Sequence, residues 1–343
     1  MINSIPKVPN AINEKILDYL PGSKEKLSIK KTLDQLKSTI IDIPIIIGGK
    51  EIRTGNTTDC VCPHDHNKVL AKFHNASEKE ANLAIEASLE AQKTWSQTPW
   101  QERVAIFKKM ASLLAGPYRD LLNASTMLGQ SKNIYQAEID AACELIDFFN
   151  FNCMFMQELY TQQPPHSPSG MWNITDYRPL EGFIFAITPF NFTSIAANLP
   201  SAPALMGNVS IWKPASSSVY SGYYIMKLFK DAGLPDGVIN FLPGSGKQLG
   251  DIILKNKNLA GVHFTGSTGV FQHIWSTVGS NIKNYKSYPR IVGETGGKDF
   301  ILAHEDCDRS ALRIAMIRGA FEYQGQKCSA ASRCYLPNSV WND

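Results

Sequence analysis

The fold is most readily inferred from the stretch Phe-Ile-Phe-Ala-Ile-Thr-Pro-Phe-Asn-Phe-Thr, which runs from Phe183 to Thr193. Its first five residues are all apolar, which is typical of a short strand buried on both faces of a parallel sheet. Further short strands are predicted at 209–212, 238–241, 262–264 and 290–292, with helical patterns between them. This alternation predicts an α/β fold built on a Rossmann-type, doubly wound parallel sheet.

Helices are predicted on both sides of this stretch. Ser77 and Glu80 form a capping box that opens a helix ending near Trp95, and Gly233 is expected to end a later helix. The segment 1–40 is polar with a helical period, which predicts an N-terminal arm; its frequent acidic residues argue against a transit peptide. Other helices are predicted at about 101–115, 118–128 and 133–160.

Composition limits the possible functions. The chain has 343 residues, 43% of them hydrophobic, so it can bury a sizeable core. Its 34 basic and 31 acidic residues give a net charge of +3, which indicates neither a nucleic acid nor an acidic membrane as a partner. The apolar runs are too short to span a bilayer. Seven cysteines are an odd number for a disulfide framework, and we expect a reducing compartment: the cytoplasm, or alternatively the mitochondrial matrix.

Two motifs suggest ligand-binding sites, but neither matches the usual spacing of such a site. The run from Cys60 to His66 holds two cysteines and two histidines, yet its alternate spacing through a proline is not a usual zinc pattern, so we predict a surface turn and no metal. The glycine-rich run from Gly244 to Gly250 is one residue longer than the dinucleotide fingerprint. We interpret it as a tight turn rather than the main cofactor site.

Cys328 is the candidate nucleophile. It lies between Lys327 and Ser329, and a nearby cation can favour the thiolate that attacks a carbonyl. A lone intracellular cysteine is more often a small buried apolar residue. Glu294, which lies in Gly-Glu-Thr-Gly-Gly-Lys, offers a carboxylate beside flexible glycines. Asn191 would by default be a turn residue after a proline.

Five motifs, in this order, resemble the aldehyde dehydrogenase superfamily: Phe-Asn-Phe-Thr at 190–193, Trp-Lys-Pro-Ala at 212–215, Phe-Thr-Gly-Ser at 264–267, Glu-Thr-Gly-Gly-Lys at 294–298 and Gly-Gln-Lys-Cys-Ser at 325–329. The stretches 136–149 and 190–208 are similar to the branch that acts on Δ1-pyrroline-5-carboxylate. The resemblance implies oxidation of L-glutamate 5-semialdehyde to L-glutamate with NAD, in proline degradation. There are two alternatives: a broad aliphatic aldehyde dehydrogenase, or an inactive fragment that binds a nucleotide or a partner.

The resemblance also implies roles for individual residues. Cys328 would attack the aldehyde, Asn191 and the Cys328 backbone N–H would stabilise the oxyanion, and a buried Glu294 would activate water. A structural acid is the alternative for Glu294. Glu144 and Phe192, with Lys327 and Ser329, are expected at the substrate; Glu144 could instead be a solvated surface acid. The expected NAD-binding residues are Thr188, Lys213, Gly266, Ser267, Thr268, Gly269 and Val270.

The helix that begins after Gly266 would offer free N–H groups to the pyrophosphate. Ser216 stands where many relatives carry a glutamate that clasps the ribose, which weakens the preference for NAD over NADP. NAD remains our expectation.

The expected domain division is an arm at 1–40, an NAD-binding domain at 41–298, and the start of a second, incomplete α/β catalytic domain at 299–343. Within the NAD-binding domain, 162–180 would contribute to a hairpin used in homo-oligomers. Members of the family continue well beyond the position of Asp343. We therefore expect exposed apolar faces, aggregation and weak turnover of this chain alone.

Overall fold

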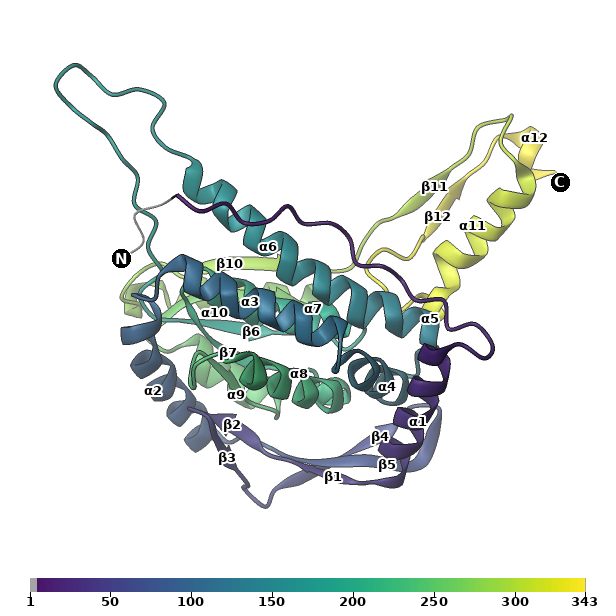
Figure 1. The fold of residues 1–343 in the computed structure, drawn as a ribbon, viewed down its shortest axis with the longest axis horizontal. Helices are drawn as coiled ribbons and strands as arrows, with labels where there is room; N and C mark the ends of the chain where they lie inside the picture. The colour runs from purple at the N-terminus through teal and green to yellow at the C-terminus, as the bar shows by residue number, and fades with distance from the viewer. Residues whose placement is uncertain (1–4, 343) are drawn as a thin grey trace.

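A seven-stranded sheet forms the centre of the protein, whose computed structural model describes residues 5–342 (Figure 1). The strand order is β10-β9-β6-β7-β8-β2-β3. The five strands from β6 to β10 pair in parallel, as the sequence predicts, whereas β2 and β3 extend the sheet in antiparallel fashion. The bounds are β2 (Ile45–Ile47), β3 (Lys50–Ile52), β6 (Phe183–Ile187), β7 (Val209–Lys213), β8 (Ile239–Phe241), β9 (Leu259–Thr265) and β10 (Arg290–Glu294).

The connecting helices lie on both faces of the sheet. The chain order reverses between β6 and β9, and ligands of doubly wound folds bind beyond the carboxyl ends of strands at such a point. The helices α7 and α8 pack with the outer helices α3 and α6, while α9 packs with α2 and α10. The connecting helices are α7 (Thr193–Leu205), α8 (Val219–Ala232), α9 (Gly246–Leu254) and α10 (Thr268–Ser280), with 3-10 turns η2 (Ser216–Ser218) and η3 (Ile282–Asn284).

The helices follow the sequence pattern with one exception. The capping box at Ser77 is formed, and Gly233 ends α8 with a φ of 94°. The helix expected over 133–160 is interrupted by a π-helical turn, in which Glu138 and Asp140 are both buried and have different partners. The bounds are α2 (Glu78–Trp95), α3 (Trp100–Ala115), α4 (Arg119–Gln130), α5 (Ile134–Ala137), the π turn η1 (Glu138–Cys143) and α6 (Glu144–Thr161).

Aromatic side chains fill the space between the sheet and α3, α6 and α8. Trp212 is fully buried, with its ring centroid 5.0 Å from that of Phe241. Phe149 of α6 lies between Phe107 and Phe229, at 6.0 and 6.3 Å, in edge-to-face contacts. The fully buried Phe149 therefore anchors α6 in the core.

A small second sheet has the order β1-β5-β4 and contains the cysteine–histidine run. This run forms a hairpin, in agreement with the expected turn, and both Cys60 and Cys62 are buried. His64 contacts the Cys62 sulfur at 3.3 Å, but residues 5–342 contain no group of three or more side chains suited to a metal ion. The strands are β1 (Ile41–Ile43), β4 (Thr57–Cys62) and β5 (Asp65–His74).

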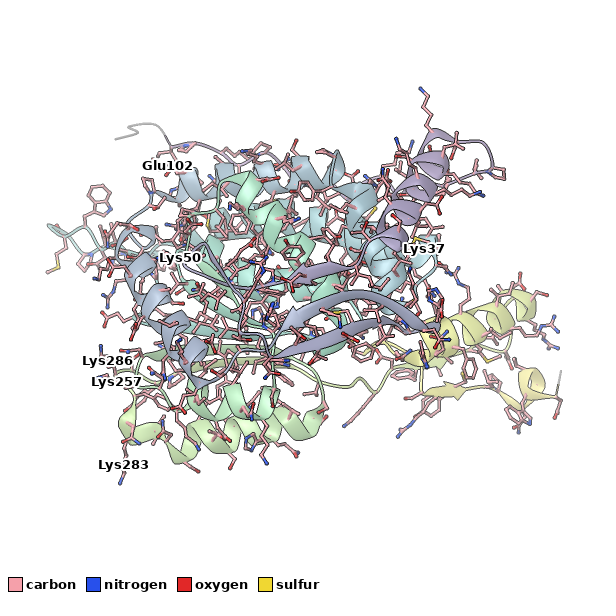
Figure 2. All side chains as sticks on the ribbon, turned by 90° about the horizontal axis from the view of Figure 1, so that it is seen from below. Lys37, Lys50, Glu102, Lys257, Lys283 and Lys286 are labelled. Atoms are coloured by element: carbon pink, nitrogen blue, oxygen red, sulfur yellow. The ribbon has the colours of Figure 1, made fainter. Side chains whose placement is uncertain are left out.

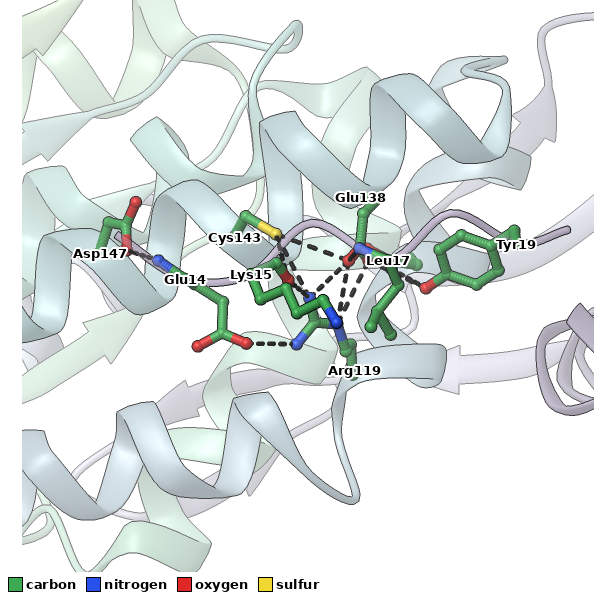
Figure 3. A network of polar contacts seen from close by, with 9 residues as sticks. Glu14, Lys15, Leu17, Tyr19, Arg119, Glu138, Cys143 and Asp147 are labelled. Carbon is green, nitrogen blue, oxygen red and sulfur yellow. Dashed lines mark hydrogen bonds and ion pairs between the residues drawn. The ribbon is translucent and has the colours of Figure 1, made fainter. Parts of the chain in front are cut away.

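The N-terminal arm lies along α6 and is held by a buried polar network (Figures 1 and 3). Glu138 is fully buried and accepts hydrogen bonds from the Leu17 backbone at 2.9 Å and the Tyr19 hydroxyl at 2.9 Å. Arg119 pairs with Glu138 and also with Glu14 at 2.7 Å. Because each buried charge has a partner, the network fixes the arm, which continues into α1 (Lys24–Ser38).

The C-terminal segment projects from the body in two perpendicular views (Figures 1 and 2). It contains β11 (Phe300–Leu302), α11 (Arg309–Phe321), η4 (Glu322–Gly325), β12 (Arg333–Tyr335) and α12 (Asn338–Trp341). None of the residues of α11 is buried, and Ile314, Ile317 and Phe321 are 60%, 63% and 72% exposed. This segment thus exposes apolar side chains, as the sequence predicts.

The loop after α6 also projects from the body (Figure 1). Gln163 holds its two arms together through hydrogen bonds of 2.9 and 3.1 Å with the Thr175 backbone. Its tip exposes Met171 and Trp172, the latter at 87%. Among the described residues, no helix is both long and apolar enough to cross a membrane.

Candidate active site

Two cavities meet at Cys328. The larger, of about 1010 Å³, lies over the carboxyl ends of β6, β7 and β9, and the smaller, of about 630 Å³, lies on the α6 side. Cys328 lines both cavities, as do Phe192 and Lys327. The structure brings together all of the site residues expected from the sequence. Those in the larger cavity are Thr188, Asn191, Phe192, Lys213, Gly266, Ser267, Thr268, Gly269, Val270, Lys327 and Cys328; those in the smaller are Glu144, Phe192, Glu294, Lys327, Cys328 and Ser329.

The N-terminus of α10 forms one wall of the larger cavity. Ser267 caps the helix by accepting a hydrogen bond from the Val270 backbone N–H at 3.4 Å. A side chain at Gly266 would meet the Phe264 ring at 2.7 Å, whereas Gly269 faces open space. The helix thus directs free N–H groups and the positive end of its dipole into an open cradle, which suits a dinucleotide pyrophosphate.

Lys213 supplies a cation to the same cavity from the end of β7. Burial lowers the pKa of its ammonium group, and no ion pair to it occurs within residues 5–342. A Cβ at Gly246 would lie 3.6 Å from the ammonium nitrogen. Gly246 begins α9, and Gly246, Lys247 and Gly250 all line the cavity. The glycine-rich run is therefore part of the cavity wall.

The surroundings of the Cys328 sulfur favour its protonated form. Burial, together with the hydrogen bond to Glu294 and the charge of its carboxylate, raises the pKa of Cys328 to about 11. Lys327 does not counter this effect, because its ammonium group pairs with Asp140 at 3.2 Å and lies 3.8 Å from Glu322. The suggestion that Lys327 favours the thiolate is therefore wrong.

Asn191 faces the loop that carries the sulfur. Its side-chain nitrogen donates to the Gln326 carbonyl at 2.7 Å, which ties the turn after β6 to this loop. One N–H of the amide remains for a substrate oxygen. The loop itself has a left-handed backbone, with φ values of 51° at Tyr323 and 56° at Gln324. Non-glycine residues persist in that conformation where surrounding contacts hold them, often at functional sites.

Glu294 ends β10 at the edge of the sheet and is exposed, so its expected burial is wrong. Its carboxylate accepts a weak hydrogen bond of 3.4 Å from the Thr265 hydroxyl and contacts the Cys328 sulfur. The glycines after it allow close approach: a Cβ at Gly297 would collide with the Cys328 carbonyl oxygen. A carboxylate beside the sulfur can act on a water or on the thiol proton.

The smaller cavity contains the side chain of Glu144. Burial raises the pKa of Glu144, while a hydrogen bond from Ser194 opposes the rise. His263 lies nearby and its pKa is lowered, again by burial. Glu144 is therefore not the solvated surface acid of the alternative interpretation. Together with Lys327, it gives this cavity groups that can recognise a substrate bearing both a carboxylate and an ammonium.

Sequence reasoning missed several residues that support the site. Asp140 lines the smaller cavity and pairs with Lys132 at 2.6 Å. Tyr323, in the nucleophile loop itself, is buried and donates to the Gln130 carbonyl at 2.7 Å. Helical periodicity does not reveal Asp140, because the π turn shifts the face on which it lies.

A sequence profile described as "Aldehyde dehydrogenase family" matches residues 51–343. The chain belongs to this family. Among curated relatives, the chain is 52% identical to "Delta-1-pyrroline-5-carboxylate dehydrogenase, mitochondrial" of Dictyostelium discoideum, over 97% of this chain and 60% of the relative. It is 44% identical to the protein of the same name from Homo sapiens, over 96% of this chain and 58% of the relative.

Solved structures agree with this assignment. The Delta-pyrroline-5-carboxylate dehydrogenase of Mycobacterium tuberculosis bound with NAD superposes with a TM-score of 0.97 at 51% identity, covering 99% of this chain and 64% of that protein. The 1-pyrroline-5-carboxylate dehydrogenase from Thermus with bound NAD gives 0.90 at 29% identity, covering 99% and 65%. The chain thus spans about 60% of the length of the relatives it matches.

Proposed function

We propose that the protein oxidises L-glutamate 5-semialdehyde, formed from Δ1-pyrroline-5-carboxylate, to L-glutamate with NAD. The observation that carries the proposal is the position of Cys328, where a cavity at the switch point of the sheet meets one lined by Glu144 and Lys327. The similarity to enzymes named for this substrate, two of them solved with bound NAD, supports the proposal.

The larger cavity would hold NAD. The N–H groups at the start of α10 would bind the pyrophosphate, and Lys213 would donate to the adenosine ribose. The other expected NAD contacts come from Thr188 and from Gly266 to Val270. When bound, NAD accepts the hydride that leaves the substrate carbon. The chain's own residues position that carbon and handle the protons.

The chemistry would begin at Cys328. The Cys328 thiol would lose its proton to water as its sulfur attacks the aldehyde carbon, so the Glu294 carboxylate beside it stays unprotonated. The amide of Asn191 and the Cys328 backbone N–H would stabilise the oxyanion. Loss of hydride leaves a thioester on Cys328. Glu294 would then activate a water that hydrolyses the thioester and releases L-glutamate.

The amino-acid end of the substrate would occupy the smaller cavity. Lys327 and Ser329, which flank the nucleophile, are placed to contact the carboxylate, and Glu144 to contact the ammonium group. The ring of Phe192 would form the wall between the two cavities. These contacts would favour glutamate semialdehyde over a plain aliphatic aldehyde.

We further propose that 41–298 form the NAD-binding domain, that 299–343 begin the catalytic domain, and that the loop at 162–180 takes part in homo-oligomers. Its exposed Met171, Trp172 and Ile174 support the last point. We place the protein in the cytoplasm or the mitochondrial matrix; the relatives named as mitochondrial support the latter. The free cysteines of the structure are compatible with either.

Comparison of two aldehydes tests the proposal. NADH formation would be followed by absorbance with Δ1-pyrroline-5-carboxylate and with hexanal, and NAD binding would be measured by calorimetry. We expect NAD binding in both the native protein and Cys328→Ala, and NADH formation only in the former, with preference for Δ1-pyrroline-5-carboxylate. Equal rates with hexanal would indicate a broad aliphatic enzyme. NADH formation by Cys328→Ala would exclude the assigned nucleophile.

A further inference from the structure

Lys132 is a buried cation at the centre of the segments that carry the reacting groups. Its side chain is 0% exposed, and its ammonium nitrogen pairs with Asp140 at 2.6 Å. The same nitrogen lies 4.5 Å from the ring centroid of Phe192 and 4.6 Å from that of Tyr323. An ammonium group bound to two aromatic faces and a carboxylate holds all three together by electrostatic attraction.

Asp140 extends this contact to the residue before the nucleophile. Its carboxylate accepts a hydrogen bond from Lys132 at 2.6 Å and forms an ion pair with Lys327 at 3.2 Å, so one acid joins two lysines. Lys327 also lies 5.4 Å from the Phe192 ring centroid. The π turn allows this arrangement, because it buries Asp140 facing the site while Glu138 faces the N-terminal arm.

The rings of Phe192 and Tyr323 belong to the two segments that carry the reacting groups. Phe192 follows Asn191, and Tyr323 begins the left-handed loop that leads to Cys328. Gln130, at the end of α4, forms hydrogen bonds to both segments. The Gln130 carbonyl accepts from the Tyr323 hydroxyl at 2.7 Å, and the Gln130 side chain donates to the Thr193 hydroxyl at 2.8 Å. Lys132 comes two residues later, after Ser131 in a left-handed conformation.

We infer that Lys132, paired with Asp140, is a positioning residue that fixes the spacing between the oxyanion donor Asn191 and the nucleophile Cys328. Lys132 lines neither cavity and acts through Phe192, Tyr323 and Lys327. The inference rests on the proposed function, because it takes Asn191 and Cys328 as reacting groups. A methionine would fill the volume of Lys132 but would attract neither Asp140 nor the rings as a cation does.

Amide hydrogen exchange, read by mass spectrometry, tests the inference without requiring turnover. In Lys132→Met, we expect exchange at least about tenfold faster in 188–195 and in 321–333, with 183–187 unchanged. Lys132→Arg keeps the charge and can contact both the acid and the rings, so it should exchange within about threefold of the native protein. The matched control is Lys227→Met, since Lys227 lies 4.7 Å from the Tyr223 ring centroid on an exposed face.

Two outcomes in a folded Lys132→Met protein would overturn the inference. One is unchanged exchange in 188–195 and 321–333, and the other is equally faster exchange throughout the chain. If circular dichroism shows that Lys132→Met does not fold, Asp140→Asn takes its place. We then expect faster exchange in 321–333, and unchanged exchange there would overturn the inference.

Turnover gives a second readout. A displacement of 1 Å between reacting groups costs about a hundredfold in rate, so Lys132→Met should lower kcat by about that factor with the KM for NAD unchanged, and Lys132→Arg should restore it. A rise in KM with kcat unchanged would contradict a positioning role. Failure of the native protein to bind NAD would count against the proposed function and would leave the exchange result standing, so the two failures are distinguishable.

Discussion

Replacement of Glu294 by glutamine should make the Cys328 thiol more reactive in the absence of NAD. The pKa of Cys328 is raised to about 11, so that at pH 8 only about one sulfur in a thousand is a thiolate. Burial is the largest cause of this rise, and Glu294 contributes through its hydrogen bond and its charge. Glutamine keeps the shape of the side chain but removes the negative charge that opposes ionisation.

The expected change in reactivity depends on how much of the rise in the Cys328 pKa is due to Glu294. Removing the carboxylate lowers the pKa of Cys328, so the thiolate fraction at a fixed pH rises, by up to about tenfold. A thiolate of lower pKa is a weaker nucleophile, with a Brønsted coefficient of about 0.4–0.5, which reduces the expected gain in alkylation rate to about threefold. In the native protein, the rate of Cys328 alkylation should keep rising with pH up to about pH 11.

The assay is alkylation by iodoacetamide between pH 7 and 10, followed by trypsin and mass spectrometry. Cleavage after Lys327 and Arg333 places Cys328 in a peptide without another cysteine. The exposed Cys334 is the internal reference, and Glu305→Gln, which removes an exposed acid elsewhere, is the control. If the alkylation rate of native Cys328 levels off near pH 8.5, or if Cys328 reacts no faster in Glu294→Gln, Glu294 does not raise the pKa of this thiol.

Three further predictions concern binding, folding and association. Lys213→Met should weaken NAD binding about tenfold or more in calorimetry, because a charge-assisted hydrogen bond is lost; unchanged affinity would place the ribose elsewhere. Arg119→Met leaves Glu138 buried and unpaired, so thermal and urea unfolding should show a loss of about 3–5 kcal/mol, and proteolysis should cut the arm at 5–20. A loss below about 1 kcal/mol would mean that the network does not hold the arm. The exposed Ile314 and Ile317 of α11 should cause concentration-dependent association in light scattering, reduced in Ile314→Lys/Ile317→Lys; a monomer at every concentration would contradict this.

The sheet could be predicted from the sequence because local patterns determine it. Apolar runs such as Phe183 to Ile187, separated by helical periods, allow little besides a buried parallel sheet, and Ser77 and Gly233 mark helix ends through local chemistry. The expected site residues come together for a related reason. Strands that run in parallel bring Thr188, Lys213 and Gly266 to one edge.

The electrostatic environment could not be predicted in the same way. A lysine adjacent to a cysteine in sequence suggests a stabilised thiolate, but Lys327 points to Asp140, which lies almost two hundred residues earlier. The sequence predicts a buried Glu294, yet this residue ends the edge strand of the sheet, and its exposure depends on what covers that edge. Both errors concern contacts between distant segments, about which spacing in the sequence says nothing.

Cys328 is proposed to form a thioester with the oxidised substrate, and this role can be tested by trapping the thioester. The Glu294→Gln protein would be mixed with NAD and Δ1-pyrroline-5-carboxylate, quenched in acid and digested. We expect a glutamyl adduct on the peptide with Cys328, absent when NAD is omitted and absent in the double variant with Cys328→Ala. An adduct on a different cysteine, or none on Cys328 while NADH is formed, would contradict it.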